Sequence, residues 1–243
     1  MIDLPSDLDL QRERIHLFLV DMDSYFPQAD DLGSLLNETE MNRAERFVFD
    51  VDRRRFIVAR AWLRRLLASY LAISPQFVKL SYNVYGKPFA ENENGLSFNL
   101  SHSGHLALFA VCRDAEIGVD IEQVKPEIAT LEIAQKFFAP KEVQLLKGVP
   151  TERRSELFFD CWTQKEAYIK AKGMGLSLDL HSFAVNFQDD DPRLLFSDHH
   201  PDDVEKFTIF KLSVPHPFKA AVASSIKSGA KDRYRRLCYL EAS

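Results

Sequence analysis

The order of helix-like and strand-like segments constrains this 243-residue chain more than any other feature. Each half contains one strand, short helices, one long helix and then two or three strands, although the two halves are not alike enough in sequence to establish a duplication. Helices followed by strands of the antiparallel type favour an α+β fold over a doubly wound parallel sheet. We therefore expect two pseudo-symmetric α+β halves, covering residues 1–114 and 115–243, with a boundary near 113–116.

The segments follow from hydrophobic periodicity and from turn residues. Residues 96–100 alternate apolar and polar side chains, and 105–112 form a second apolar run after a Ser-His-Ser-Gly turn, which predicts a β-hairpin. The expected helices are 40–49, 52–72, 130–138, 140–147 and 152–172, and the remaining expected strands are 15–20, 117–124, 182–187, 206–214 and 219–226. A basic residue followed by Gly173 marks the end of the last helix.

Composition excludes several classes of protein. A formal net charge of −5 argues against a nucleic-acid-binding protein. Three widely spaced cysteines suggest neither a disulfide framework nor a metal site. The N-terminus does not resemble a signal peptide, and no apolar run approaches the roughly 20 residues that cross a bilayer. We expect a soluble, cytoplasmic protein that does not interact with membranes.

Positive charge is nevertheless concentrated locally. Residues 43–65 contain eight arginines and three acidic residues. Such a patch on an acidic protein suggests a small anionic ligand or an acidic partner. A solvated helix face explains most of these arginines equally well.

Two carboxylates on one predicted strand suggest a metal site. Asp120 and Glu122, in Gly-Val-Asp-Ile-Glu, lie at positions i and i+2 and therefore face the same side, roughly 6–7 Å apart. Mg²⁺ prefers oxygen ligands and usually retains water and substrate phosphates. An exposed sheet face is the alternative explanation for the pair.

The last long helix carries further charges on its apolar side. Glu166 follows Trp162 by four residues and Phe159 by seven, so it lies on the aromatic stripe, and Lys165 is placed similarly. Buried charges need partners. The two readings are an internal Lys–Glu pair, or a third metal ligand beside a phosphate-binding lysine, with Lys170 one turn further on.

Three other features could bind phosphate. Arg55 shares a helix stripe with apolar residues, and a covered guanidinium favours a bidentate anion. Lys87, in Tyr-Gly-Lys-Pro, is held on a rigid turn, although a lone lysine there is usually just exposed. His102 lies between Ser101 and Ser103 at a strand end. This segment is either the edge of a binding site or an ordinary turn.

Taken in order, Y-G-K-P, F-N-L-S-H-S, G-V-D-I-E, F-F-x-x-x-E and W-x-x-K-E-x-x-x-K resemble a 4′-phosphopantetheinyl transferase of the long, surfactin-synthetase-activating (Sfp) type. The resemblance extends from about Glu38 to Ala223. It implies two α+β halves in one chain with the active site in the cleft between them. It also implies a monomer that carries one complete site.

The resemblance implies a reaction as well. A serine of an apo acyl or peptidyl carrier protein attacks coenzyme A, the substrate, and receives its 4′-phosphopantetheine arm, while 3′,5′-ADP leaves with the help of Mg²⁺. Carriers of polyketide, nonribosomal peptide or fatty acid biosynthesis are the expected partners.

The residue roles are implied by the same resemblance. Asp120, Glu122 and Glu166 would bind the metal; Glu142, Glu166 and Lys170 would act in catalysis; and Arg43, Arg55, Lys87, Ser101, His102, Asp120, Lys165 and Lys170 would bind coenzyme A. Within these, Glu142 would help to deprotonate the acceptor serine, and Arg55 and His102 would bind the 3′-phosphate. Glu40 departs from the pattern, because some relatives have a lysine at this position, three residues before Arg43.

Two alternatives remain beside this reading. A non-catalytic protein of the same fold could bind coenzyme A or a carrier domain, but such a homologue would lack a metal carboxylate or a helix lysine. A Mg²⁺-dependent phosphatase would share the carboxylates without needing the other motifs together.

Overall fold

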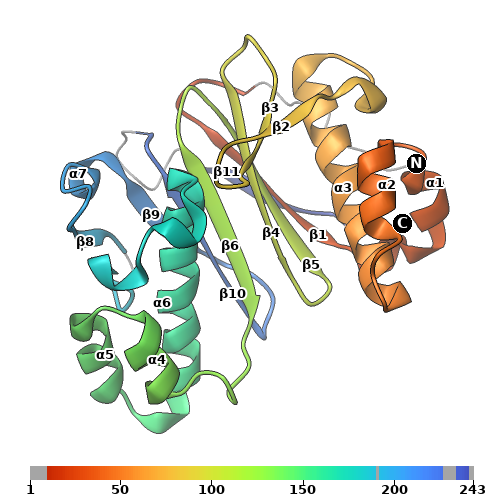
Figure 1. The fold of residues 1–243 in the computed structure, drawn as a ribbon. Coiled ribbons are helices and arrows are strands. Elements are labelled where there is room, and N and C mark those ends of the chain that lie inside the picture. The colour runs from red at the N-terminus through yellow and green to blue at the C-terminus, as the bar shows by residue number, and fades with distance from the viewer. Residues whose placement is uncertain (1–9, 190–191, 227–233, 241–243) are drawn as a thin grey trace.

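The computed structural model describes residues 10–189, 192–226 and 234–240. Two β-sheets lie back to back in the middle of the molecule, and one long helix covers the outer face of each (Figure 1). The two expected α+β halves are confirmed, each with a long helix and a mainly antiparallel sheet.

The first half is built on a four-stranded sheet with the order β11-β1-β5-β4, in which β11 (Tyr234–Leu240) comes from the end of the chain. Its elements are β1 (Ile15–Asp21), α1 (Ala29–Gly33), α2 (Glu38–Ala44), α3 (Asp50–Leu71), β2 (Leu80–Tyr82), β3 (Pro88–Ala90), β4 (Leu96–Ser103) and β5 (Leu106–Arg113). The predicted hairpin is confirmed as the antiparallel pair β4–β5, whose turn contains Gly104 at a φ of +56°.

The second half contains a three-stranded sheet with the order β6-β10-β9 and a separate pair, β7–β8. Its elements are β6 (Ile117–Gln123), α4 (Leu131–Phe137), α5 (Pro140–Lys147), α6 (Thr151–Lys172), β7 (Phe183–Val185), β8 (Leu194–Ser197), α7 (Asp203–Lys206), β9 (Thr208–Leu212) and β10 (Phe218–Ser224). Gly173 ends α6 in the left-handed conformation, as its position predicts.

Alternation along the strands produces three apolar layers. In β1, Phe18 and Val20 pack toward α3, whereas Leu17 and Leu19 point to the other sheet. The inner face of β6 carries Ile117, Val119 and Ile121 into the same central layer. Because successive side chains alternate between faces, Asp120 and Glu122 necessarily lie on the α6 side of β6.

Three details differ from the predictions. β11 (Tyr234–Leu240) pairs in parallel with β1, so this segment belongs to the first sheet although it follows the second half in sequence. α2 ends at Ala44 rather than at residue 49, and Val48 and Phe49 are exposed. β4 continues through Ser103, so the Ser-His-Ser segment is part of the strand and not of the turn.

Two further features concern the cysteines and the helices. All three cysteines are free. Among the described residues, no helix is both long and apolar enough to span a membrane.

Candidate active site

Close packing of α6 on β6 creates the site. A Cβ atom at Gly118 would lie 2.1 Å from the carbonyl oxygen of Ala167 and 2.3 Å from the backbone nitrogen of Ala171. Only glycine permits this approach of helix to strand. It brings Glu166 and Lys170 of α6 next to the carboxylates that follow Gly118 on β6.

Asp120 is the centre of this cluster. Its side chain is buried, and its Oδ1 accepts hydrogen bonds from Lys170 Nζ at 2.6 Å and from Ser101 Oγ at 2.8 Å. Two residues along the strand, the Oε2 of Glu122 accepts a hydrogen bond from Ser103 Oγ at 2.8 Å. The structure thus joins residues that are about 20 to 70 positions apart in sequence, as the hydrogen-bond pairs show.

The three carboxylates influence one another. Burial raises the pKa of Asp120, and Lys170 and Ser101 offset part of that effect. Burial and then the charge of Asp120 raise the pKa values of both Glu122 and Glu166. Such mutual repulsion between partly desolvated acids is relieved when a cation binds between them.

The donor set fits Mg²⁺ that shares its coordination with a substrate. Asp120 Oδ2 is buried and has no hydrogen-bond partner in the described part of the chain. Within that same part, no three His, Cys, Asp or Glu side chains form a ready-made metal cluster. Mg²⁺ usually needs only one or two protein carboxylates because waters and phosphates complete its shell.

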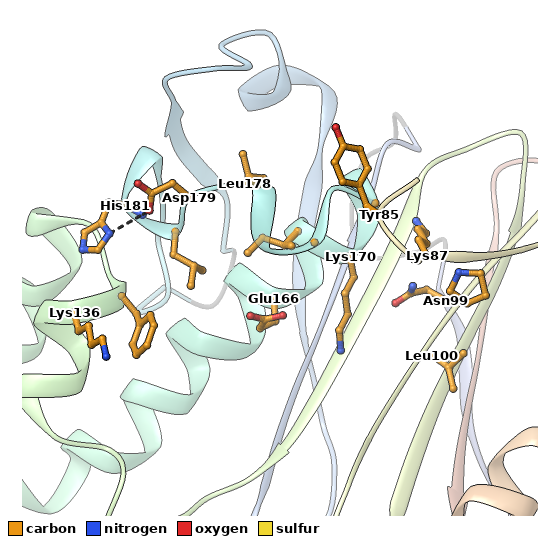
Figure 2. Close-up of a pocket in the computed structure, with 17 residues that line it drawn as sticks. Tyr85, Lys87, Asn99, Leu100, Lys136, Glu166, Lys170, Leu178, Asp179 and His181 are labelled. Carbon is orange, nitrogen blue, oxygen red and sulfur yellow. Dashed lines mark hydrogen bonds and ion pairs between the residues drawn. The ribbon is translucent and has the colours of Figure 1, made fainter. Parts of the chain in front are cut away.

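Two adjoining cavities lie beside the cluster. The first, of about 630 Å³, lies between the halves, with Glu166 and Lys170 of α6 facing Asn99 and Leu100 of β4 (Figure 2). The second, of about 620 Å³, is lined from the first half, including His102 and Ser103. Gly86, Pro88 and Leu100 line both cavities, so the two adjoin at these residues.

The second cavity gathers positive charge. Arg43, Arg55 and Arg60 line it together with His102. Loss of hydration lowers the pKa of His102, and the charges of Lys170 and Arg43 lower it further. A cavity of this kind attracts an anion.

Comparison with known proteins decides the family. The N-terminal model of 4′-phosphopantetheinyl transferases matches residues 26–114, and the 4′-phosphopantetheinyl transferase superfamily model matches 116–223. The transferase HetI of Nostoc sp. is 42% identical over 176 residues, which cover 71% of this chain and 74% of HetI. The chain belongs to the 4′-phosphopantetheinyl transferase family. It transfers the 4′-phosphopantetheine arm of coenzyme A to carrier proteins.

Other transferases are similar over somewhat less of the chain. Psf-1 of Bacillus pumilus is 36% identical, with 67% of this chain and 69% of psf-1 covered. Sfp of Bacillus subtilis is 32% identical, with 65% of this chain and 69% of Sfp covered. The resemblance to the Sfp type that the motifs indicated is therefore confirmed.

Glu142 and Lys165 form an ion pair in the interior and do not belong to the lining of either cavity. Both side chains are completely buried, and Lys165 Nζ donates to Glu142 Oε2 and to the Phe183 carbonyl oxygen, each at 2.7 Å. The other contacts of Glu142 are accepted from the backbone N–H groups of Ala139 and Val185. These contacts join α5, α6 and β7, and the expected roles of the two residues in catalysis and coenzyme A binding stay predictions.

Two other cations, Arg55 and Lys87, have partners within the protein. Arg55 does have the bidentate anion that its position predicts, but the anion is Asp23, bound through Nε and Nη2 at 2.7 Å each. Lys87 lines the first cavity, but its Nζ donates to the carbonyl oxygens of Ile117 and Ala171, which attaches the β2–β3 turn to the second half. Burial lowers the pKa of Lys87 to about 8.

Sequence reasoning missed some functional neighbours of the site. Gly118 directly precedes the acidic strand motif, and a glycine inside a strand pattern is itself a signal of close backbone approach. No local signal identifies Asp23, because it lies 32 residues before its partner Arg55. Ser101, which was expected to bind coenzyme A, contacts Asp120 and Lys170 within the protein.

Proposed function

We propose that the transferase binds coenzyme A across the two adjoining cavities, with its pyrophosphate beside Asp120, Glu122, Glu166 and Lys170. The observation that carries this proposal is the convergence of three carboxylates and a lysine where α6 packs on β6. The adenosine 3′-phosphate would enter the second cavity, where Arg43 and His102 lie. The arm would extend into the first.

Asp120, Glu122 and Glu166 are the residues that would hold Mg²⁺. When bound, this ion neutralises charge that develops on the phosphates during transfer. The serine oxygen forms a bond to the β-phosphorus, and the bond from that phosphorus to the bridging oxygen breaks, so 3′,5′-ADP leaves with the electron pair. Lys170 Nζ can donate to the departing phosphate, because its partly exposed side chain reaches from Asp120 into the first cavity.

Glu166 faces the acceptor in this proposal. It lies on the wall of the first cavity, where a carboxylate oxygen that is not bound to the metal could accept a proton. The proton of the serine hydroxyl would therefore move to the Glu166 side of the site and not to the buried Glu142.

The proposal also covers the acceptor protein, the cellular compartment and the oligomeric state. The acceptor is an apo carrier protein or domain of polyketide, nonribosomal peptide or fatty acid biosynthesis. The proposal also places the enzyme in the cytoplasm as a monomer. The cavities combine residues from both halves of one chain, which supports one site in each chain.

Substitution of two metal-binding carboxylates tests the shared site. Asp120→Ala and Glu166→Ala should each lower Mg²⁺-dependent kcat by about 100-fold or more, and the double variant should be little worse, because the residues act as a unit. Glu152→Gln, on an exposed turn at the start of the same helix, is the matched control. Full Mg²⁺-dependent activity in either single variant would contradict the proposed site.

A further inference from the structure

The two serines of Ser-His-Ser point away from the histidine between them. Ser101 and Ser103 lie on the side of β4 that faces β6, whereas His102 lies on the opposite side and lines the second cavity, which Ser103 also borders. This separation follows from strand geometry, since neighbouring side chains alternate between faces. The Ser-His-Ser segment can therefore contact β6 through its serines and the second cavity through His102.

The serines match the carboxylates in spacing. Positions 101 and 103 on β4 bond positions 120 and 122 on β6, each pair two residues apart. The hydroxyl of Ser103 makes two contacts, because it donates to Glu122 Oε2 at 2.8 Å and accepts from the backbone N–H of Gln123 at 3.1 Å. Both the donor and the acceptor of this one hydroxyl are thus directed to β6.

On this side of β4, side chains take the place of backbone–backbone hydrogen bonds to β6. β4 and β6 are edge strands of different sheets. Between them, Asn99 Oδ1 accepts from the backbone N–H of Val119 at 2.9 Å, and Ser103 Oγ accepts from that of Gln123. Because these contacts fix the backbone of β6 relative to β4, the serine hydroxyls have a defined direction from which to hold a carboxylate.

The effect on Asp120 shows what such a hydroxyl can do. Ser101 Oγ and Lys170 Nζ both bond Oδ1, which leaves the buried Oδ2 without a partner in the described part of the chain. One oxygen is thereby oriented and the other is kept available. Ser101 itself is only 7% exposed and does not contribute to the lining given above for either cavity.

From these contacts we infer that Ser103 and Ser101 are positioning residues that orient Glu122 and Asp120 for the metal, one serine for each carboxylate. This inference rests on the proposed metal site. Hydrogen-bond partners of metal ligands typically contribute about 10- to 100-fold to metal affinity. Ser103 is the better test, because Ser101 also contacts Lys170.

Metal binding without turnover measures this role. Mn²⁺ serves as the probe for the Mg²⁺ site, and electron paramagnetic resonance reports free and bound Mn²⁺ in the presence of coenzyme A and the absence of carrier. Ser103→Ala should weaken Mn²⁺ binding by about 10-fold or more. Ser103→Thr keeps the hydroxyl and should retain most of the wild-type Mn²⁺ affinity. Ser97→Ala removes a hydroxyl from the same strand, and in the described structure that hydroxyl bonds no carboxylate, so binding should not change.

A double variant separates positioning from general damage to the fold. If Ser103 acts through Glu122, adding Ser103→Ala to Glu122→Gln should weaken Mn²⁺ binding no further. Additive losses would overturn the inference, as would wild-type Mn²⁺ affinity in Ser103→Ala.

Ser103 also lines the second cavity, so a direct contact with coenzyme A is the competing explanation. Calorimetry of coenzyme A binding to Ser103→Ala without metal distinguishes positioning from direct contact. A positioning role leaves the affinity for coenzyme A unchanged. A loss of coenzyme A affinity equal to the loss of Mn²⁺ affinity would overturn the inference. A wild-type protein that binds no Mn²⁺ with coenzyme A would contradict the proposed metal site itself.

Discussion

Lys165 and Glu142 form an ion pair inside the second half. Their charged atoms are wholly buried 2.7 Å apart, and the Lys165 ammonium also lies 4.1 Å from the centre of the Phe183 ring. Removing one member of such a pair leaves the other charge uncompensated in the interior. The pair should therefore govern stability.

Glu142→Gln should lower the free energy of unfolding by about 3–5 kcal/mol, measured by denaturant titration. Turnover per folded molecule should remain close to wild type. The double variant Glu142→Leu with Lys165→Met should lose less stability than the sum of the two single substitutions, because no buried charge remains. A stable Glu142→Gln protein that has lost turnover would instead indicate a chemical role.

His102 gives the second residue-scale prediction, a pH dependence of substrate selectivity. Its lowered pKa makes the free imidazole neutral at neutral pH, and a bound 3′-phosphate would raise that pKa again. The complex then binds more protons than the free enzyme, so affinity rises as pH falls through the pKa of the complex.

The affinity ratio of coenzyme A to 3′-dephospho-coenzyme A should therefore increase between about pH 8 and about pH 6. His102→Gln should remove most of this change, and Arg43→Ala should lower the ratio throughout. Calorimetry of both ligands provides the measurement. A wild-type ratio that does not change with pH would argue against contact between His102 and the phosphate.

At the scale of elements, the contact of α6 with β6 decides where the catalytic groups stand. Gly118→Ala should push the helix away from the strand, because the new Cβ would meet backbone atoms of α6. We expect a loss of about 1–3 kcal/mol in stability and about 100-fold in kcat. At Gly148, by contrast, a Cβ would meet no backbone atom closer than 3.5 Å, so Gly148→Ala is the control. Equal stability and equal kcat in the two variants would show that the close approach of α6 to β6 is unimportant.

Hydrophobic periodicity predicts helices and strands better than it predicts which side chains contact one another in the folded chain. The β4–β5 hairpin and the end of α6 follow from alternation and from Gly173, which are local properties. The aromatic stripe correctly indicated that Lys165 is covered, but it could not reveal Glu142, 23 residues earlier, as its partner. The Asp23–Arg55 pair and the β4–β6 contacts were missed for the same reason, since tertiary packing creates them.

The whole molecule combines two halves around one composite site. Residues 85–88 and 99–100 from the first half line the cavity opposite Glu166 and Lys170 from the second. β11 returns to the first sheet, so the chain crosses between the halves again after the second sheet is complete. Neither half alone contains the groups of the first cavity.

One chain should therefore carry one complete site. Specific activity per chain should stay constant as the enzyme is diluted through any range in which light scattering detects dissociation of a dimer. Loss of specific activity on dilution, with recovery on concentration, would indicate a site shared between chains.

Intact-mass spectrometry of apo carrier proteins tests the central claim most directly. A panel of carriers from peptide synthetases, polyketide synthases and fatty acid synthesis is incubated with the enzyme, coenzyme A and Mg²⁺. At least one carrier should gain the mass of a single phosphopantetheinyl group on its serine, with 3′,5′-ADP formed in equal amount, and Asp120→Ala should abolish the gain. A folded enzyme that binds coenzyme A and modifies none of these carriers would contradict the account.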